Sequence, residues 1–220
     1  MKNLKKYLLL AAVLITVFPA FSKNYYVKQI LIASAQADGR MDTLTQETFI
    51  SDDLIIIADE FSITYIDDKA YEFYNTTNKT FYKKTFKELT DIMYSTDSQL
   101  KDFEMKTTGE KKKIGPWNTE KYLGNAKVMD MAMDLDMYVA KDTGFPADLM
   151  IRQQEKMQKD SKNIKNMMDK IKATGGIVVR EVARIGGTVV SEKEITAMKI
   201  IDKIDEKYTK RPEGYTEMKQ

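Results

Sequence analysis

The segment VMDMAMDLDMYVAK, residues 128–141, restricts the fold more than any other part of the chain, because apolar and polar residues alternate along most of its length. Side chains of a β-strand point alternately to its two faces. One face of this strand would carry Met129, Met131, Met133, Leu135, Met137 and Val139. The other face would carry Asp130, Ala132, Asp134, Asp136 and Tyr138. This pattern is typical of an antiparallel sheet with one buried face and one face in water.

The methionines of this segment leave three interpretations open. Methionine is a flexible apolar side chain that fills irregular cores, and it also lines adaptable cavities for apolar ligands. Its thioether is a soft donor that binds Cu(I). The aspartates do not predict a calcium site, since consecutive ones lie about 6.7 Å apart along a strand and do not share an ion unless the chain bends. The alternation favours a buried face, and hence a core or a cavity lining.

The rest of the chain predicts a single α+β domain with a large antiparallel sheet. Short β-branched and aromatic runs between Tyr25 and Lys83 are separated by turn residues such as Asp67-Asp68, which indicates an antiparallel meander. Apolar residues at helical spacing predict a short helix over 86–93. Further strands are predicted at 103–107 and onward to Tyr122, at 177–182, at 188–190 and at 195–201, with a tight turn at Gly186-Gly187.

A long amphipathic helix is predicted from Leu149 to Lys172. Its narrow apolar stripe consists of residues that recur every seven positions, and Gly175-Gly176 ends the pattern. The stripe residues are Met150, Met157, Ile164 and Ile171. Residues 149–173 carry seven basic and three acidic side chains, a net charge of +4, so the helix lies either on an anionic membrane surface or as a lid on the sheet. Its apolar face has no Trp or Phe to anchor it in lipid, so we expect a lid.

The composition excludes most catalytic chemistry. The chain has no histidine and no cysteine, which removes Ser-His-Asp and Cys-His catalysis, the usual zinc ligand sets and any disulfide. The adjacent acids Asp52-Asp53 and Asp67-Asp68 occupy turn positions, where paired carboxylates are common without function. We therefore expect a protein that is not an enzyme and that needs no cofactor.

The N-terminal residues predict export. A short basic head is followed by an uncharged apolar run over residues 7–18, and Pro19 and Ala20-Phe21-Ser22 then favour cleavage after Ser22. The competing interpretation is an uncleaved N-terminal anchor. We thus expect a signal peptide at 1–22 and one domain at 23–220, located in the periplasm or secreted, with no lipoprotein cysteine and no transmembrane segment. Removal of three lysines leaves a net charge of −1, which argues against nucleic acid as a partner.

The order of these pieces resembles a known family. The meander ends in DDKAYEFYNTTNKTFYKK, and TTGEKKKIGPWNTEKY, a strand ending YVAKD and a final RPEGY follow. This resembles an uncharacterised family of exported bacterial proteins with a LolA-like fold, related to periplasmic carriers of lipoproteins. Pro116-Trp117 departs from the family, which more often has tyrosine after the glycine. The resemblance implies that the sheet curves into an incomplete barrel with helices across its open side.

Together these points predict an exported protein that binds an apolar ligand, a lipid or an acylated partner, in the half-barrel. The cavity lining is predicted to include Met129, Met131, Met133, Met137, Met157 and Ile164. The alternatives are a structural or interaction protein of the cell envelope with a filled barrel, and a Met-rich Cu(I) binder.

Overall fold

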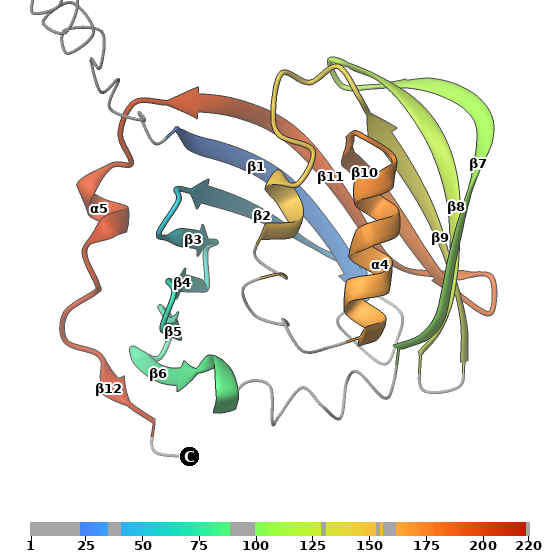
Figure 1. The fold of residues 1–220 in the computed structure, drawn as a ribbon. Helices are drawn as coiled ribbons and strands as arrows, with labels where there is room; N and C mark the ends of the chain where they lie inside the picture. The colour runs from blue at the N-terminus through green and yellow to red at the C-terminus, as the bar shows by residue number, and fades with distance from the viewer. Residues whose placement is uncertain are drawn as a thin grey trace, which may run out of the picture.

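The computed structural model describes residues 23–34, 41–88, 100–128, 131–152, 155 and 162–218. The predicted signal peptide, Met129 and Met157 lie outside these residues. The described strands form one sheet (Figure 1). Its strands are β1 (Asn24–Ser34), β2 (Met41–Ile50), β3 (Ile55–Ala58), β4 (Ser62–Ile66), β5 (Ala70–Asn75), β6 (Thr80–Thr85), β7 (Leu100–Ile114), β8 (Trp117–Val128), β9 (Met131–Ala140), β10 (Ile177–Ile185), β11 (Thr188–Ile201) and β12 (Thr216–Glu217).

The sheet has twelve strands in the order β12-β6-β5-β4-β3-β2-β1-β11-β10-β9-β8-β7. Every neighbouring pair is antiparallel except β12 and β6, which are parallel. β12 and β7 form the two edges and do not pair with each other, so the sheet is open. The prediction of an α+β domain with a large antiparallel sheet is therefore confirmed.

Few helices accompany the sheet. The described ones are the 3₁₀ turn η1 (Leu149–Ile151) and the α-helices α4 (Lys162–Ala173) and α5 (Glu206–Thr209). Figure 1 shows the sheet bending around α4, so that η1 and α4 lie on one face of it, here called the inner face. Of the helix predicted over 149–172, residues 149–151 form the 3₁₀ turn η1 and residues 162–172 belong to α4, and most residues between these elements lie outside the described ranges. Of the helix predicted over 86–93, residues 86–88 are helical and the rest lie outside the described residues.

Local turn chemistry explains how the strands follow one another. The Asp67 side chain accepts hydrogen bonds from the backbone N–H groups of Lys69, at 2.7 Å, and Ala70, at 2.9 Å, which fixes the turn into β5. Gly186 and Gly187 have φ of +58° and +82°, as the hairpin turn between β10 and β11 requires. Both turns were predicted from the sequence.

Two strands differ from the predictions. β2 was not anticipated, because its sequence MDTLTQETFI contains too few apolar residues to show an alternation. β11 is one continuous strand across Ser191-Glu192-Lys193-Glu194, where the sequence indicated two separate strands. Arg180 of β10 forms ion pairs with Glu192, at 2.5 Å, and Glu194, at 3.7 Å, so this polar stretch is held within the sheet.

The core is divided between the two faces of the sheet. Apolar residues such as Val27 and Met137, both fully buried, pack on the inner face. A second cluster around Phe49 and Tyr65 packs on the opposite, outer face. Residues 202–218, here called the C-terminal tail, contribute Ile204, Tyr208 and Tyr215 to that second cluster. The tail thus covers the outer face over β2–β6.

Candidate functional site

A cavity of about 290 Å³ lies between α4, η1 and the inner face of the sheet. Its apolar wall consists of Phe103 of β7, Met133, Leu135 and Met137 of β9, Ala147, Met150 and Ile151 at η1, Met167, Met168 and Ile171 of α4, and Ile177, Val178 and Ala183 of β10. Glu181 of β10 and Ser191 and Lys193 of β11 also line it. The cavity is thus mainly apolar, with its polar groups drawn from two adjacent strands.

Of the residues predicted to line a cavity, Met133 and Met137 do so. Met137 is fully buried and Met133 is half-buried, because the alternation predicted for β9 directs them to the inner face. Met131 does not line the cavity, since it lies at the first position of β9 and its side chain is 48% exposed. Ile164 is half-buried in the first half of α4 and is not part of the wall.

Sequence reasoning missed the other methionines of the cavity. Met150 comes from η1, and Met167 and Met168 come from α4, so thioethers from three elements face one space. Met150 belongs to the predicted helical stripe, whereas Met167 and Met168 fall outside its seven-residue spacing. The signal that was available is the abundance of methionine, 14 residues in the chain, several of which lie in β9, η1 and α4, which the fold brings together.

A β-bulge at the start of β7 places one side of the wall. Asp102 has φ of +55°, and the pairing of β7 with β8 shifts register between Lys101 and Glu104. Bulges re-aim side chains, and here Phe103 is buried to 2% exposure in the cavity wall. Lys170 of α4 donates a hydrogen bond of 2.6 Å to the Phe103 carbonyl, which ties the helix to this bulge.

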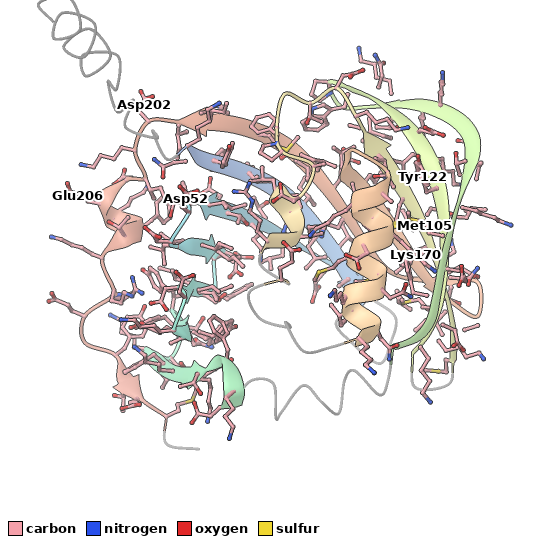
Figure 2. The ribbon with its side chains drawn as sticks, viewed as in Figure 1. Asp52, Met105, Tyr122, Lys170, Asp202 and Glu206 are labelled. Atoms are coloured by element: carbon pink, nitrogen blue, oxygen red, sulfur yellow. The ribbon has the colours of Figure 1, made fainter. Side chains whose placement is uncertain are left out.

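Side-chain contacts near its C-terminal end fix the position of α4. Figure 2 shows Lys170 on the side of the helix that faces β7, where its ammonium also lies 3.1 Å from the Glu104 carboxylate. Lys172 forms an ion pair with Glu155. At the C-terminus of the helix, the Thr174 hydroxyl donates to the Ile171 carbonyl at 2.7 Å. The contacts of Lys170 and Lys172 hold the C-terminal half of the helix over the inner face.

Two glycines bring the backbone close to this region. A Cβ on Gly124 of β8 would lie 2.8 Å from Met137 Cε and 3.3 Å from Phe103 Cε2. A Cβ on Gly176, between α4 and β10, would lie 2.6 Å from the Ala140 carbonyl oxygen. Glycine at both positions therefore permits the close packing behind the wall.

The polar part of the cavity was also missed from sequence. Glu181 and Lys193 are directly opposite each other in the β10–β11 ladder, so both point to the inner face. Among the described residues neither forms an ion pair. The signal for Glu181 is a charge on the face of IVVREVARI whose other residues are apolar, whereas Arg180 and Arg184 lie on the opposite face.

The aspartates of β9 do not gather at a metal site. Asp136 lies 2.9 Å from Arg184 and 3.3 Å from Lys121 on the outer face, and Asp134 is exposed. Within the described ranges, no group of three or more acidic residues is arranged to hold a metal ion.

Buried polar contacts hold the C-terminal tail on the outer face. Glu72 of β5, 9% exposed at its side chain, lies 3.0 Å from Lys83 and 3.2 Å from Arg211 of the tail. Burial alone would raise the pKa of Glu72, but the hydrogen bonds from Lys83 and Arg211 outweigh it and lower this pKa. The Arg211 guanidinium also lies 4.2 Å from the centre of the Tyr65 ring.

A second carboxylate anchors the same tail. Glu47 of β2 accepts hydrogen bonds from the hydroxyls of Tyr26, at 2.7 Å, and Tyr208, at 2.8 Å. These two bonds lower the pKa of Glu47. Burial together with the bond to Glu47 raises the pKa of both Tyr26 and Tyr208 to about 12. The tail is therefore held through ionised carboxylates and protonated tyrosines.

No family model and no curated protein matches the sequence. Among solved structures, an uncharacterized conserved protein from Thermus thermophilus aligns with a TM-score of 0.54 and 9% identity, over 90% of this chain and 91% of that chain. The structure of PNGF-II aligns with a TM-score of 0.42 and 15% identity, over 90% of this chain but only 31% of that chain. The Thermus protein is similar to this chain in its fold alone.

Within the described residues, no helix has the length and apolar character needed to cross a membrane.

Proposed function

We propose that this chain is an exported, LolA-like protein that is not an enzyme and that binds an apolar ligand in the cavity beneath α4. The ligand is the acyl chain of a lipid or of an acylated partner. In this proposal the open sheet acts as an incomplete barrel and α4 as its lid.

The observation that carries the proposal is the apolar cavity itself. Protein interiors are packed with few voids larger than a water molecule. The cavity of about 290 Å³ is partly open to solvent and most of its wall is apolar, so water inside it finds few hydrogen-bond partners on the protein. An apolar ligand would displace this water and restore the missing van der Waals contacts.

The composition of the wall supports an adaptable apolar ligand. Methionine has an unbranched, polarisable side chain that repacks around ligands of different shape. Five methionines line the cavity, from β9, η1 and α4. Aliphatic and aromatic side chains such as Ile171 and Phe103 complete the wall, which suits a hydrocarbon chain.

Calorimetric titration with saturated fatty acids of increasing chain length tests the proposal. We expect affinity to rise with each added methylene until the chain fills the cavity, and then to level off. Ala183→Phe would fill the cavity from β10 and abolish binding, whereas Ala197→Phe, outside the wall on β11, would leave it intact. Met167→Trp on α4 provides a second blocking variant in case Ala183→Phe fails to fold. Absence of binding by the folded wild-type protein would refute the proposal.

A Cu(I) site is a second candidate, because thioethers from three elements face the same space and soft sulfur ligands suit this ion. Replacement of Met133 and Met137 by Leu distinguishes the two candidates. Leucine preserves apolar volume but has no sulfur, so fatty-acid binding would persist, while Cu(I) would lose the two thioethers of β9 and bind more weakly. Tight Cu(I) binding by the wild type that this double variant weakens strongly would favour the copper site.

A further inference from the structure

We infer that the cavity accepts an amphiphile with one hydrocarbon chain and a zwitterionic head group, whose anionic part lies at Lys193 and whose ammonium part lies at Glu181. This inference rests on the proposed function and deepens it. It adds the chemistry of the head group, which nothing in the apolar wall specifies.

The volume of the cavity favours a single chain. At 290 Å³ it lies near the lower end of the usual range for small-molecule pockets, about 300–1,000 Å³. A methylene group occupies about the 30 Å³ that a water molecule takes in the liquid, so the space holds about ten such groups. One medium acyl chain fits, whereas a second chain of the same length would remain in water.

The pair of opposite charges defines the head group. Glu181 and Lys193 face each other across β10 and β11, with Cβ atoms about 4.5–5.5 Å apart for such a pair. Both are half-buried, both line the cavity, and within the described residues neither has an ion-pair partner. A half-buried charge without a partner is costly, so each charge favours a ligand group of opposite sign.

The four types of head group satisfy this pair to different extents. A neutral head leaves each charge facing only the other across the ladder. A purely anionic head satisfies Lys193 but is repelled by Glu181, and a cationic head does the reverse. A zwitterion is attracted by both residues at once, so the site discriminates by the sum of two charged contacts.

Four probes that share a ten-carbon chain test the inference below their micelle-forming concentrations. They are decanol, decanoate, decylammonium and decanoyl lysophosphatidylethanolamine, measured by titration calorimetry with the full chain. We expect the wild type to bind the zwitterionic probe at least about tenfold more tightly than any of the other three, as a second charged hydrogen bond would give.

Two variants assign the two ends of the head group. Lys193→Met should weaken the zwitterionic probe and decanoate about tenfold and leave decylammonium equal or tighter. Glu181→Gln should weaken the zwitterionic probe and decylammonium and leave decanoate equal or tighter. Lys199→Met, an exposed lysine on the same strand, and Glu213→Gln, an exposed acid of the tail, serve as controls and should change nothing. If Lys193→Met does not fold, Lys193→Gln removes the same charge with less change in polarity.

The outcomes separate the head-group inference from the proposed function. Binding of all four probes with similar affinity, unchanged in both variants, would overturn the head-group inference and leave the proposed function standing. The same would follow if the variants changed every probe equally, since a loss of packing has no sign preference. Failure of the wild type to bind any probe would overturn both.

Discussion

Replacement of Arg211 by methionine measures how strongly the C-terminal tail stabilises the domain. Methionine keeps the apolar stem but removes the guanidinium, which lies 3.2 Å from the Glu72 carboxylate and 4.2 Å from the centre of the Tyr65 ring. A hydrogen bond between charged groups contributes about 1.5–3 kcal/mol and a cation–π contact about 0.5–2 kcal/mol. Because Arg211 is 35% exposed and Lys83 still pairs with Glu72 in the variant, we expect a loss of unfolding free energy at the lower end of the summed contributions, about 2–3 kcal/mol.

The assay is urea unfolding followed by circular dichroism and by the fluorescence of Trp117, the one tryptophan of the chain. Glu72→Gln and the double variant complete a thermodynamic cycle, whose coupling energy should be about 1–2 kcal/mol. The control is Lys203→Met in the same tail, because the Lys203–Glu206 pair is 73% and 68% exposed and should contribute less than about 0.5 kcal/mol. If Arg211→Met costs no more than Lys203→Met, the buried contact does not hold the tail and the reasoning is wrong.

Three further predictions concern pH and packing. The folded-state pKa of Glu47 and of Glu72 lies below the ordinary 4.5. The stabilisation of the fold by these two carboxylates is therefore complete above pH 4.5 and is lost as pH falls through the folded pKa. The urea midpoint should fall steeply in acid, and it should fall less in Glu72→Gln. The pKa of Tyr208 in the folded state is raised from 10.0 to about 12. The contribution of Tyr208 to stability is therefore complete below pH 10 and is lost as pH rises through 12. Tyr208→Phe should remove one late step from the tyrosinate absorbance titration. Gly176→Ala should lower the free energy of unfolding by about 1–3 kcal/mol, because the new Cβ would lie 2.6 Å from the Ala140 carbonyl oxygen. Urea unfolding measures this loss, and an unchanged midpoint would show that α4 moves away freely.

The sheet was predictable where residues alternate or where turns carry specific side chains. β9 and the Gly186-Gly187 hairpin are examples, because period two and positive φ leave direct traces in the sequence. β2 was not predictable in this way, since Thr and Gln occupy inward positions there and weaken the contrast between its faces. The strand is instead fixed by its ladders to β1 and β3, which are tertiary contacts.

The candidate site was predictable only in part for the same reason. Met133 and Met137 follow from the alternation of their own strand. Met167 and Phe103 reach the cavity only because α4 docks against the bulge of β7, and no local pattern encodes that contact. Met131 lies outside the wall of this cavity, because alternation gives the face of a residue but not how far along the strand the covering helix extends.

The C-terminal tail was also invisible to pattern reasoning. Its segment RPEGY is part of the family resemblance, yet no local pattern indicates where Arg211 or Tyr215 points. Tyr215 lies edge-on to Tyr74 with ring centres 5.4 Å apart, and Tyr74 is more than a hundred residues earlier in the chain. An arginine followed by an aromatic residue near the end of a β-rich chain indicates a docked segment only after the sheet is known.

The central place of β1 has a consequence for how the chain reaches this structure. The sheet consists of two groups of strands, β1–β6 and β7–β11, and within each group the strands pair mainly with neighbours near in sequence. Within the described strands, the two groups join only where β1 pairs with β11, from Asn24 opposite Ile201 onward. Closure of so large a loop is slow compared with hairpin formation. Until it happens, β1 exposes a long edge of unpaired backbone groups, which can add a strand from another copy of the chain. The yield of folded protein should therefore fall with concentration, and it should depend more on how quickly this single ladder closes than on the stability of either half.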